Sequence, residues 1–366
     1  MAKKERRCKH PLLRIFGTLL AAVLAAAILF LGFLTVTEWK PADTEAVTIT
    51  GAGESILDAA EPITLLTWNT GYAGLDETQD CFLDGGKRVR AASEDTVRQN
   101  AQAIADVIVA QNPDIVLLQE VDCNSDRSYR VDQGSKYSEI FGKAETSAYA
   151  RNYYTPFVPY PLPPIGKVDC GLFTLSRAAM TEATRYQLPI SFTWPVRMVN
   201  LKRCLLVTRF DLQGTGKELV VVNLHLEAYA PKEAKSAQTA ILKQVLEEEY
   251  AKGNYVIAGG DWNMTLYGVD PALYPIVDDS YYVAEQMEKD ETPAGWPLLF
   301  DESTPTCRLL NKPYDPTDPA TQYYVIDGFV ISPNLDVLKV QTLDLGFAHS
   351  DHNPVALTVV CIETPR

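Results

Sequence analysis

Histidine and basic charge are both scarce in this chain of 366 residues. It has only four histidines, and 33 Lys and Arg face 47 Asp and Glu, for a net charge of −14. This acidic balance argues against a protein that binds duplex nucleic acid tightly without regard to sequence, because such proteins carry a basic face. With 46% hydrophobic residues, no internal repeat and scattered Gly and Pro, the chain is neither wholly disordered nor fibrous.

Cysteine pairs of the Cys-x-x-Cys type are also missing, which argues against a structural zinc site. Of the seven cysteines, Cys8 precedes the long apolar run described next. The other six are Cys81, Cys123, Cys170, Cys204, Cys307 and Cys361. An even number permits disulfides in an oxidising compartment, and buried free thiols are the alternative.

One long apolar run is present, at residues 15–36. It contains no charged residue, and as a helix it would extend ~33 Å, enough to cross the core of a bilayer. Basic residues precede the run, so the positive-inside rule predicts a cytoplasmic N-terminus and a domain outside the cell membrane. A cleaved signal peptide is the alternative, but its apolar region is usually only about 7–15 residues long. The sequence therefore favours an uncleaved, single-pass anchor.

Charge and composition divide the chain into four parts. We expect a basic cytoplasmic tail at 1–14, a transmembrane helix at 15–36, a polar linker at 37–61 and a catalytic domain at 62–362. From residue 41 onward the chain holds 26 Lys and Arg against 45 Asp and Glu, a net charge of −19. The outer part would therefore not be drawn to an anionic surface by its overall charge.

Apolar runs and helical stripes succeed one another in the predicted catalytic domain. Apolar runs predict strands at 63–68, 114–118, 171–175, 204–210, 219–225, 255–260, 323–330 and 355–361, and spacing predicts helices over 94–111 and 231–251. We expect the runs 171–175 and 204–210 to pair antiparallel. The proline-rich stretch 153–164 predicts a stiff loop that lines a cleft, approaches the membrane or packs on the surface. The mixed order favours two packed sheets with helices outside.

Polar residues suited to phosphate or metal chemistry stand at the ends of these strands. They are Asn69, Glu120, His225, Asp261 with Asn263, Asp327, and the run Ser350-Asp351-His352-Asn353 before the last strand. Each alone could be a turn residue or a solvated strand end. Their repeated appearance at successive strands predicts one shared site. His349 has no such context, and we interpret it as a surface or loop histidine.

The motifs at these positions resemble the endonuclease/exonuclease/phosphatase superfamily. The matching segments are LTWN at 66–69, PDIVLLQE at 113–120, VNLHL at 222–226, GDWN at 260–263, IDGF at 326–329 and SDHNPV at 350–355. The resemblance implies an α/β fold, a four-layer α/β/β/α sandwich of two mixed sheets, and hydrolysis of phosphoesters with Mg²⁺, or alternatively Mn²⁺. Trp262 and Gly328 depart from the usual pattern and could reshape the rim of the pocket.

The resemblance and the chemistry together assign roles to these residues. Hydrolysis of a phosphoester needs a cation on a phosphate oxygen, a base for water and stabilisation of the leaving oxygen. We expect Glu120, with Asn69 and Asp351, to bind the metal ion, because Mg²⁺ prefers oxygen ligands. We expect Asp327 to orient His352 and Asp261 to act on the attacking water. The full predicted catalytic set is His225, Asp261, Asn263, Asp327 and His352.

Substrate contacts are expected from Asn263, Tyr153 and Lys167, although the last two could equally lie on a surface loop. The membrane anchor favours a phospholipid head group as substrate, as a phospholipase C or sphingomyelinase would take. DNA or RNA outside the cell is the alternative, with nucleic acid entering only as substrate. A surface binding module on a degenerate enzyme fold is a further hypothesis, which the intact set of catalytic residues disfavours.

Overall fold

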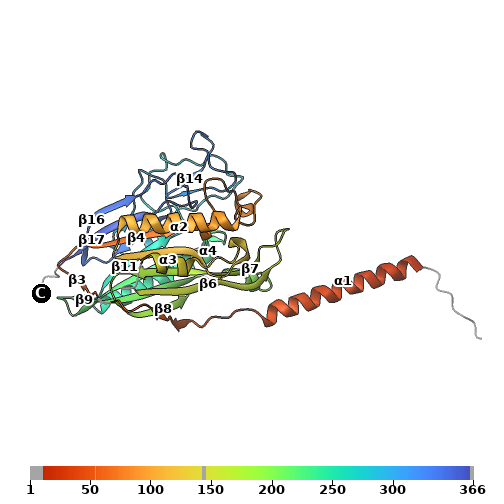
Figure 1. Ribbon diagram of the computed structural model, residues 1–366, viewed down its shortest axis with the longest axis horizontal. Helices are drawn as coiled ribbons and strands as arrows, with labels where there is room; N and C mark the ends of the chain where they lie inside the picture. The colour runs from red at the N-terminus through yellow and green to blue at the C-terminus, as the bar shows by residue number, and fades with distance from the viewer. Residues whose placement is uncertain (1–10, 54, 142–145, 363–366) are drawn as a thin grey trace, which may run out of the picture.

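The computed structural model describes residues 11–53, 55–141 and 146–362. Its first element is helix α1 (Pro11–Val36), which projects from the rest of the chain as a single long rod (Figure 1). Its segment Leu12–Val36 is long and apolar enough to cross a membrane, and the predicted apolar helix is confirmed to that extent. Residues 1–10 of the predicted basic tail, with Cys8, lie outside the described residues.

Two mixed sheets form the body of the domain. Sheet A has eight strands: β1 (Thr44–Ala46), β8 (Met180–Gln187), β9 (Cys204–Gln213), β10 (Lys217–His225), β11 (Tyr255–Asp261), β15 (Asp327–Ile331) and β12 (Leu298–Leu299) in spatial order, with β3 (Leu57–Asp58) paired to β9. Sheet B has seven strands, in the order β16 (Leu335–Thr342), β17 (Val355–Cys361), β4 (Ile63–Asn69), β5 (Ile115–Asp122), β7 (Gly166–Ser176), β6 (Thr146–Val158) and β2 (Ile49–Thr50). β10 and β11 run parallel, as do β4 and β5.

Helices cover the outer faces of both sheets. α4 (Lys232–Ala251) lies on sheet A, where Leu242 packs with Val220 and Val256. α2 (Glu94–Gln111) and α3 (Gln133–Phe141) lie on sheet B (Figure 1). A further core fills the space between the sheets. This arrangement confirms the predicted four-layer α/β/β/α sandwich.

The apolar runs of the sequence arise because many strands are buried on both faces. Successive side chains on a strand point to opposite sides of the sheet. Leu65 of β4 therefore joins the core between the sheets, whereas its neighbour Leu66 packs beneath α2. Val116 and Leu117 of β5 divide in the same way. A strand covered on both sides reads as an unbroken apolar run, which is why the sequence located these strands well.

Two details of the predicted strand pattern are wrong. The runs 171–175 and 204–210 do not pair, because they lie in β7 of sheet B and β9 of sheet A, and β9 pairs with β8 and β10. The predicted strand over 323–330 is interrupted: β14 (Tyr323–Tyr324) pairs with β13 (Cys307–Arg308), and β15 starts at Asp327. β8 was not predicted, because its sequence, MTEATRYQ, contains no apolar run.

The predicted linker and the predicted proline-rich loop both contribute to the sheets. β1, β2 and β3 fall within 37–61 and add short strands to the two sheets. Such pairing uses backbone groups, so a polar composition gives little sign of it. β6 continues to Val158, and residues 159–165 form the tip of the β6–β7 hairpin.

The six cysteines that follow α1 are free. Cys170, Cys204 and Cys307 are buried, and burial raises the pKa of all three thiols. A thiol held in its neutral form reacts slowly with oxidants and disulfides. Of the two alternatives for these cysteines, the structure has the free thiols.

The end of α1 is packed against the domain. Glu38 accepts hydrogen bonds from Arg197 Nε at 3.1 Å and from Lys202 Nζ at 2.9 Å, and the Glu38 and Lys202 side chains are buried. Trp39 meets the ring of Tyr154 edge to face at 6.4 Å. The helix is therefore held at one place on the domain, beside β6 and the segment before β9.

Candidate functional site

Sheet register brings the predicted site residues together at one end of the sandwich. In sheet A, His225 at the end of β10 pairs with Asp261 at the end of parallel β11, and Asp261 pairs with Asp327 at the start of antiparallel β15. In sheet B, Asn69 ends β4, and the segment carrying His352 leads into antiparallel β17. Strand ends that share an edge place their polar side chains side by side, so five separate motifs meet.

Hydrogen bonds join the two sheets at this end. The Asn69 amide nitrogen of sheet B donates to Asp261 Oδ2 of sheet A at 2.9 Å. Gln119 Nε2 of β5 donates to Asn223 Oδ1 of β10 at 2.8 Å, and both side chains are fully buried. Gln119 and Asn223, which belong to the motifs PDIVLLQE and VNLHL, therefore have a structural role: they link the two sheets below the site.

His352 and Asp327 form the shortest pair of the site. His352 Nδ1 lies 2.8 Å from Asp327 Oδ2, and both side chains are buried. Burial opposes a charged imidazole, but the Asp327 carboxylate outweighs it and raises the pKa of His352 well above its ordinary value. His352 is therefore positively charged at neutral pH and presents its Nε2–H toward Asp261, 3.8 Å from Asp261 Oδ2.

Asp261 lies at the centre of the cluster. Its Oδ2 also lies 3.4 Å from His225 Nε2, and its Oδ1 accepts the backbone N–H of Asn263 at 2.9 Å. Burial, reinforced by the neighbouring Asp327 carboxylate, raises the pKa of Asp261 to about 6. A carboxylate with that pKa can accept a proton near neutral pH.

His225 differs from His352 in charge. Burial lowers the pKa of His225 well below its ordinary value, and the positive charge of Arg203 acts in the same direction. His225 is therefore neutral, and its Nδ1 has no hydrogen-bond partner among the described residues. The site therefore holds one charged and one neutral imidazole, and both approach Asp261 Oδ2.

Glu120 enters the site through an irregularity in β5. The pairing of β5 with β7 shifts register between Leu118 and Val121, and Glu120 has a positive φ of 54°. Such a bulge redirects a side chain that regular pleating would aim elsewhere. Glu120 Oε1 lies 3.5 Å from the Asn69 amide nitrogen, and its side chain keeps 23% of its surface exposed, toward the cavity.

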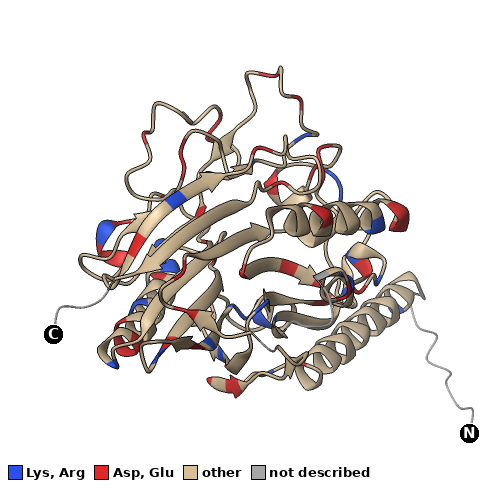
Figure 2. Ribbon diagram, turned by 60° about the vertical axis from the view of Figure 1, so that its left-hand side comes forward, with Lys and Arg blue, Asp and Glu red and all other residues tan. Residues whose placement is uncertain are grey.

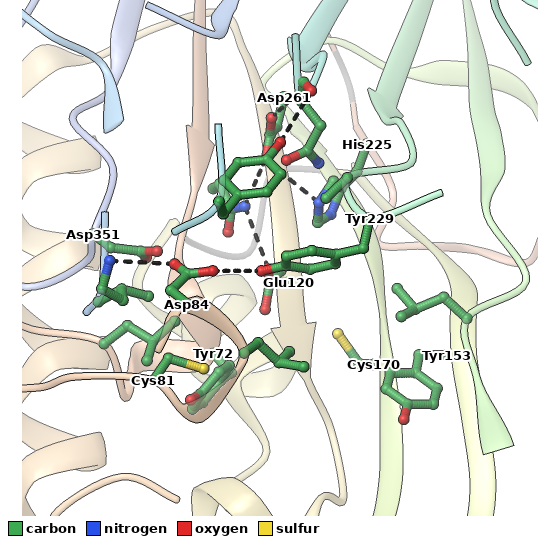
Figure 3. A pocket seen from close by; sticks show the side chains of 18 of the residues that line it. Tyr72, Cys81, Asp84, Glu120, Tyr153, Cys170, His225, Tyr229, Asp261 and Asp351 are labelled. Atoms are coloured by element: carbon green, nitrogen blue, oxygen red, sulfur yellow. Dashed lines mark hydrogen bonds and ion pairs between the residues drawn. The ribbon is translucent and has the colours of Figure 1, made fainter. Parts of the chain in front are cut away.

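A cavity of about 560 Å³ opens over this cluster. Figure 3 shows carboxylates from different elements, Glu120, Asp261 and Asp351, around the same space. Burial and the nearby negative charge of Glu120, partly offset by His352, raise the pKa of Asp351 to about 7. Asn263 also lines the cavity, and its amide nitrogen donates to the backbone oxygen of Leu226 at 2.8 Å.

Two groups of side chains lie close enough to hold a metal ion in the described part of the chain. They are Cys307, Asp351 and His352, and Asp261, Asp327 and His352. Asp351 is the only predicted metal ligand in either group. Glu120 faces the same cavity as Asp351, while Asn69 turns its amide nitrogen, not its oxygen, toward Glu120.

Of the two substrate contacts predicted on β6 and β7, only Tyr153 reaches the cavity. Tyr153 lines the cavity, but its hydroxyl donates to the backbone oxygen of Val199 at 2.9 Å. Lys167 does not line the cavity, and its backbone N–H donates to Asp126.

Two buried polar residues of the cavity wall were missed by the sequence analysis as site residues. Arg203 lines the cavity and forms a long ion pair with Glu227 at 4.0 Å, while its Nε and Nη1 have no hydrogen-bond partner among the described residues. Asn152 lines it too, with both amide atoms likewise unpartnered. A buried guanidinium with free N–H groups beside a cavity suits an anionic ligand. The signal for Arg203 was weak, since it precedes an apolar strand and does not end one.

Comparisons with known proteins identify the family and the fold. A family model described as "Endonuclease/Exonuclease/phosphatase family" matches residues 66–352. No curated protein matches the chain. An endonuclease/exonuclease/phosphatase from Beutenbergia cavernae is 19% identical, with a TM-score of 0.56 over 82% of this chain and 72% of that one.

Two further solved structures are similar. An endonuclease/exonuclease/phosphatase family protein from Bacteroides thetaiotaomicron is 16% identical, with a TM-score of 0.51 over 82% of this chain and 98% of that one. The human Nocturnin catalytic domain, solved with bound sulfate, is 17% identical, with a TM-score of 0.50 over 86% of this chain and 97% of that one. At these identities the likeness shows the fold.

Proposed function

Because this chain belongs to the endonuclease/exonuclease/phosphatase family, as its motifs suggested, we propose that it is a divalent-metal-dependent phosphoester hydrolase held at the cell membrane by α1. The family name covers nucleases and phosphatases, which are hydrolases of phosphoesters. The observation that carries the proposal is the convergence of His225, Asp261 and His352 on one cavity, with Asp327 bound to His352 at 2.8 Å.

The carboxylates of the cavity suit a divalent cation. Glu120 and Asp351 face the same space; Glu120 Oε2 lies 3.5 Å from Arg127 Nη2, whereas in the described part of the chain no Lys or Arg forms an ion pair with Asp351. Asp327 Oδ1 is buried without a hydrogen-bond partner. We infer that Glu120 and Asp351 hold Mg²⁺, or alternatively Mn²⁺, while Asn69 orients Glu120 by donating to it. The bound ion would offset the charge on a phosphate oxygen.

Asp261 and the two histidines supply the groups for in-line attack by water. Asp261 accepts a proton from the attacking water, whose oxygen forms a bond to phosphorus while the bond to the leaving oxygen breaks. His352, kept charged by Asp327, donates its Nε2–H to a phosphate oxygen and stabilises the charge that develops there. His225 is neutral and contributes a hydrogen bond, and we assign Asn263, which lines the same cavity, to the phosphate as well.

Arg203 and Asn152 complete the polar wall as phosphate ligands. Both side chains are buried at the cavity with unused hydrogen-bonding atoms. Arg203 Nε lies 4.0 Å from Glu227 Oε2, too far for a hydrogen bond, so a charged hydrogen bond to a phosphate oxygen would satisfy N–H groups that have none. The sequence-based assignment of Tyr153 and Lys167 to the substrate has less support, given where the structure puts them.

The orientation of the chain in the membrane is part of the proposal. Basic residues precede α1, and α1 itself carries almost no charge, whereas Asp and Glu are spread over the domain (Figure 2). This pattern supports a cytoplasmic N-terminus and a domain outside the cell membrane. Protease added to intact cells would then digest the domain, and protection of the domain until the cells are lysed would contradict this orientation.

Hydrolysis of a soluble phosphodiester tests the proposed activity. The full-length chain, purified in detergent, should release nitrophenolate from bis(p-nitrophenyl) phosphate with Mg²⁺ and stop when EDTA is added. His352→Ala should lose activity by about 10²–10⁴-fold. His349→Ala is the matched control, since His349 lies outside the cavity. Wild-type activity in folded His352→Ala would overturn the assignment.

The natural substrate needs a panel of phosphoesters with the same protein. DNA, RNA, sphingomyelin, phosphatidyl lipids and inositol phosphates represent the chemical classes that such a site could hydrolyse. Nicking of plasmid DNA would support a nuclease, and release of phosphorylated head groups from vesicles would support a phospholipase of the C type. A folded protein that turns over none of them would favour a non-catalytic binding module.

A further inference from the structure

The cavity extends well beyond the polar cluster into an apolar chamber. We define this apolar chamber by Phe82, Val158, Tyr160, Phe192, Val196 and Leu201, all of which line the same cavity as the catalytic residues. They come from the 81–89 loop, the tip of the β6–β7 hairpin and the segment before β9. A phosphate group makes no use of such a surface, so the chamber must serve another part of the ligand.

Two of the segments that wall the chamber, β6 with its hairpin tip and the segment before β9, also contact α1. Residues Val196–Val199 form a short 3₁₀ helix, and within it Met198 Sδ lies 3.3 Å from Thr35 Oγ1 of α1. Trp194 Nε1 donates to the same Thr35 hydroxyl at 3.4 Å. The rings of Phe157, on β6, and Phe30, on α1, meet edge to face at 6.2 Å. The apolar chamber therefore adjoins the anchor helix.

These contacts indicate how deep in the membrane the wall of the chamber would lie. Phe30 lies ~9 Å before the end of α1 along the helix axis. If α1 spans the bilayer, its partner Phe157 stands at the level of the outer-leaflet hydrocarbon. The residues that follow Phe157 at the hairpin tip are apolar and exposed, with Tyr160 at 70% and Leu162 at 88%. Trp194, across from them, is 51% exposed. Exposed apolar side chains at that level suit contact with lipid.

We propose that the substrate is a lipid phosphoester of the outer leaflet, whose hydrocarbon chain occupies the apolar chamber while its phosphate lies between His352 and Arg203. This inference rests on the proposed hydrolase function and on α1 spanning the membrane. The lipid reaches the site sideways, past the hairpin tip and the 3₁₀ helix, without leaving the bilayer. A lipid leaving the membrane for water would lose the burial of its chain, and the adjoining chamber avoids that loss.

A nucleobase is the competing occupant of an aromatic pocket. Phe82 and Tyr160, whose rings lie 6.0 Å apart, could pack against a base. Two observations favour the hydrocarbon chain. The chamber adjoins α1 and the exposed apolar tip, and the chain from residue 41 onward carries a net charge of −19, which repels a polyanion.

A series of alkyl phosphocholines, whose hydrolysis is followed by the phosphocholine released, tests the proposal with the full-length protein in detergent. The ethyl, hexyl and decyl esters share the reacting centre and differ only in the length of the chain. We expect kcat/KM to rise at least tenfold from ethyl to decyl, because each buried methylene favours the bound state by roughly fourfold.

Val196→Glu places a charge at the chamber wall, at a residue that is half exposed and outside the polar cluster. It should reduce the gain from ethyl to decyl to less than threefold. Val109→Glu, at a similarly exposed valine on α2, is the matched control and should retain the full gain.

Each outcome of the series is informative. Equal rates for the three esters would overturn the lipid proposal and leave the hydrolase function standing. A thymidine p-nitrophenyl phosphodiester that outperforms the decyl ester would assign the chamber to a nucleobase instead. No hydrolysis of any ester by the folded protein would contradict the proposed function itself.

Discussion

The polar cluster and the apolar chamber share one cavity, yet they are built from different elements. His225, Asp261 and Asp327 stand on neighbouring strands of sheet A, and their positions follow from strand register. The chamber is formed by a hairpin tip and two loops. Sheet register tolerates little change, whereas loops vary in length and composition without loss of the fold. From this comparison we infer that the sheets position the catalytic residues and that the loops determine which substrate binds.

The largest effect is expected from a variant of the polar cluster, and it should not depend on which ester is used. Asp261→Asn removes the proposed proton acceptor, so hydrolysis of soluble and lipid esters alike should fall about 10³-fold. The melting temperature should not fall, because a carboxylate whose pKa is raised by burial is replaced by a neutral side chain. Exposed Asp278→Asn is the control. A loss confined to lipid esters would place Asp261 in substrate selection.

A smaller but equally general loss is expected at Arg203. Arg203→Met removes a charged hydrogen bond to phosphate, so kcat/KM should fall about 10- to 100-fold for every ester, mainly through KM. Arg98→Met, at an exposed residue of α2, should change nothing. Unchanged KM with a lower kcat would instead give Arg203 a part in the chemical step.

The next effect should be specific to lipid. Leu162→Glu puts a charge at the exposed hairpin tip, so hydrolysis of lipid in vesicles should fall roughly five- to tenfold, because a charged side chain enters hydrocarbon at a cost. The soluble diester should be hydrolysed at the wild-type rate. Leu338→Glu, on β16 at the opposite edge of sheet B from β6, is the matched control. Equal losses of activity on both substrates would show that the hairpin tip does not act through membrane binding.

The smallest effect concerns the metal ion and pH. Burial raises the pKa of Asp351 to about 7, so its deprotonation costs the metal-free fold stability as pH rises from about 4 to 7. Saturating Mg²⁺ should raise the melting temperature by about 2–4 °C near pH 8 and by less near pH 5, where protons compete. Calorimetry measures both, and Glu120→Gln should remove the response. A response equal at both pH values would contradict binding at these carboxylates.

The polar cluster could be predicted from the sequence because several of its residues stand at the ends of apolar runs, which mark buried strands. Asn69, His225 and Asp261 each end a strand buried on both faces, and such strands read as apolar runs. Their partners across the cluster could also be anticipated, because strand ends that share an edge lie together. The same reasoning placed the two outer helix layers.

The apolar chamber could not be predicted in this way. Its residues come from three segments far apart in sequence, and apolar residues in loops have no periodicity to reveal a shared surface. Arg203 was missed because a basic residue before a strand is usually solvated. The bulge that turns Glu120 into the site, and the short strands within 37–61, depend on backbone pairing that composition does not encode.

The most direct measurement gives the full-length protein, reconstituted in vesicles of sphingomyelin and phosphatidyl lipids, a choice between lipid and added plasmid DNA in Mg²⁺. We predict release of phosphorylated head groups, intact plasmid, and loss of the release with EDTA or in His352→Ala. Nicked plasmid with intact lipid would contradict the account, since the cluster would then act on a substrate that the chamber does not select.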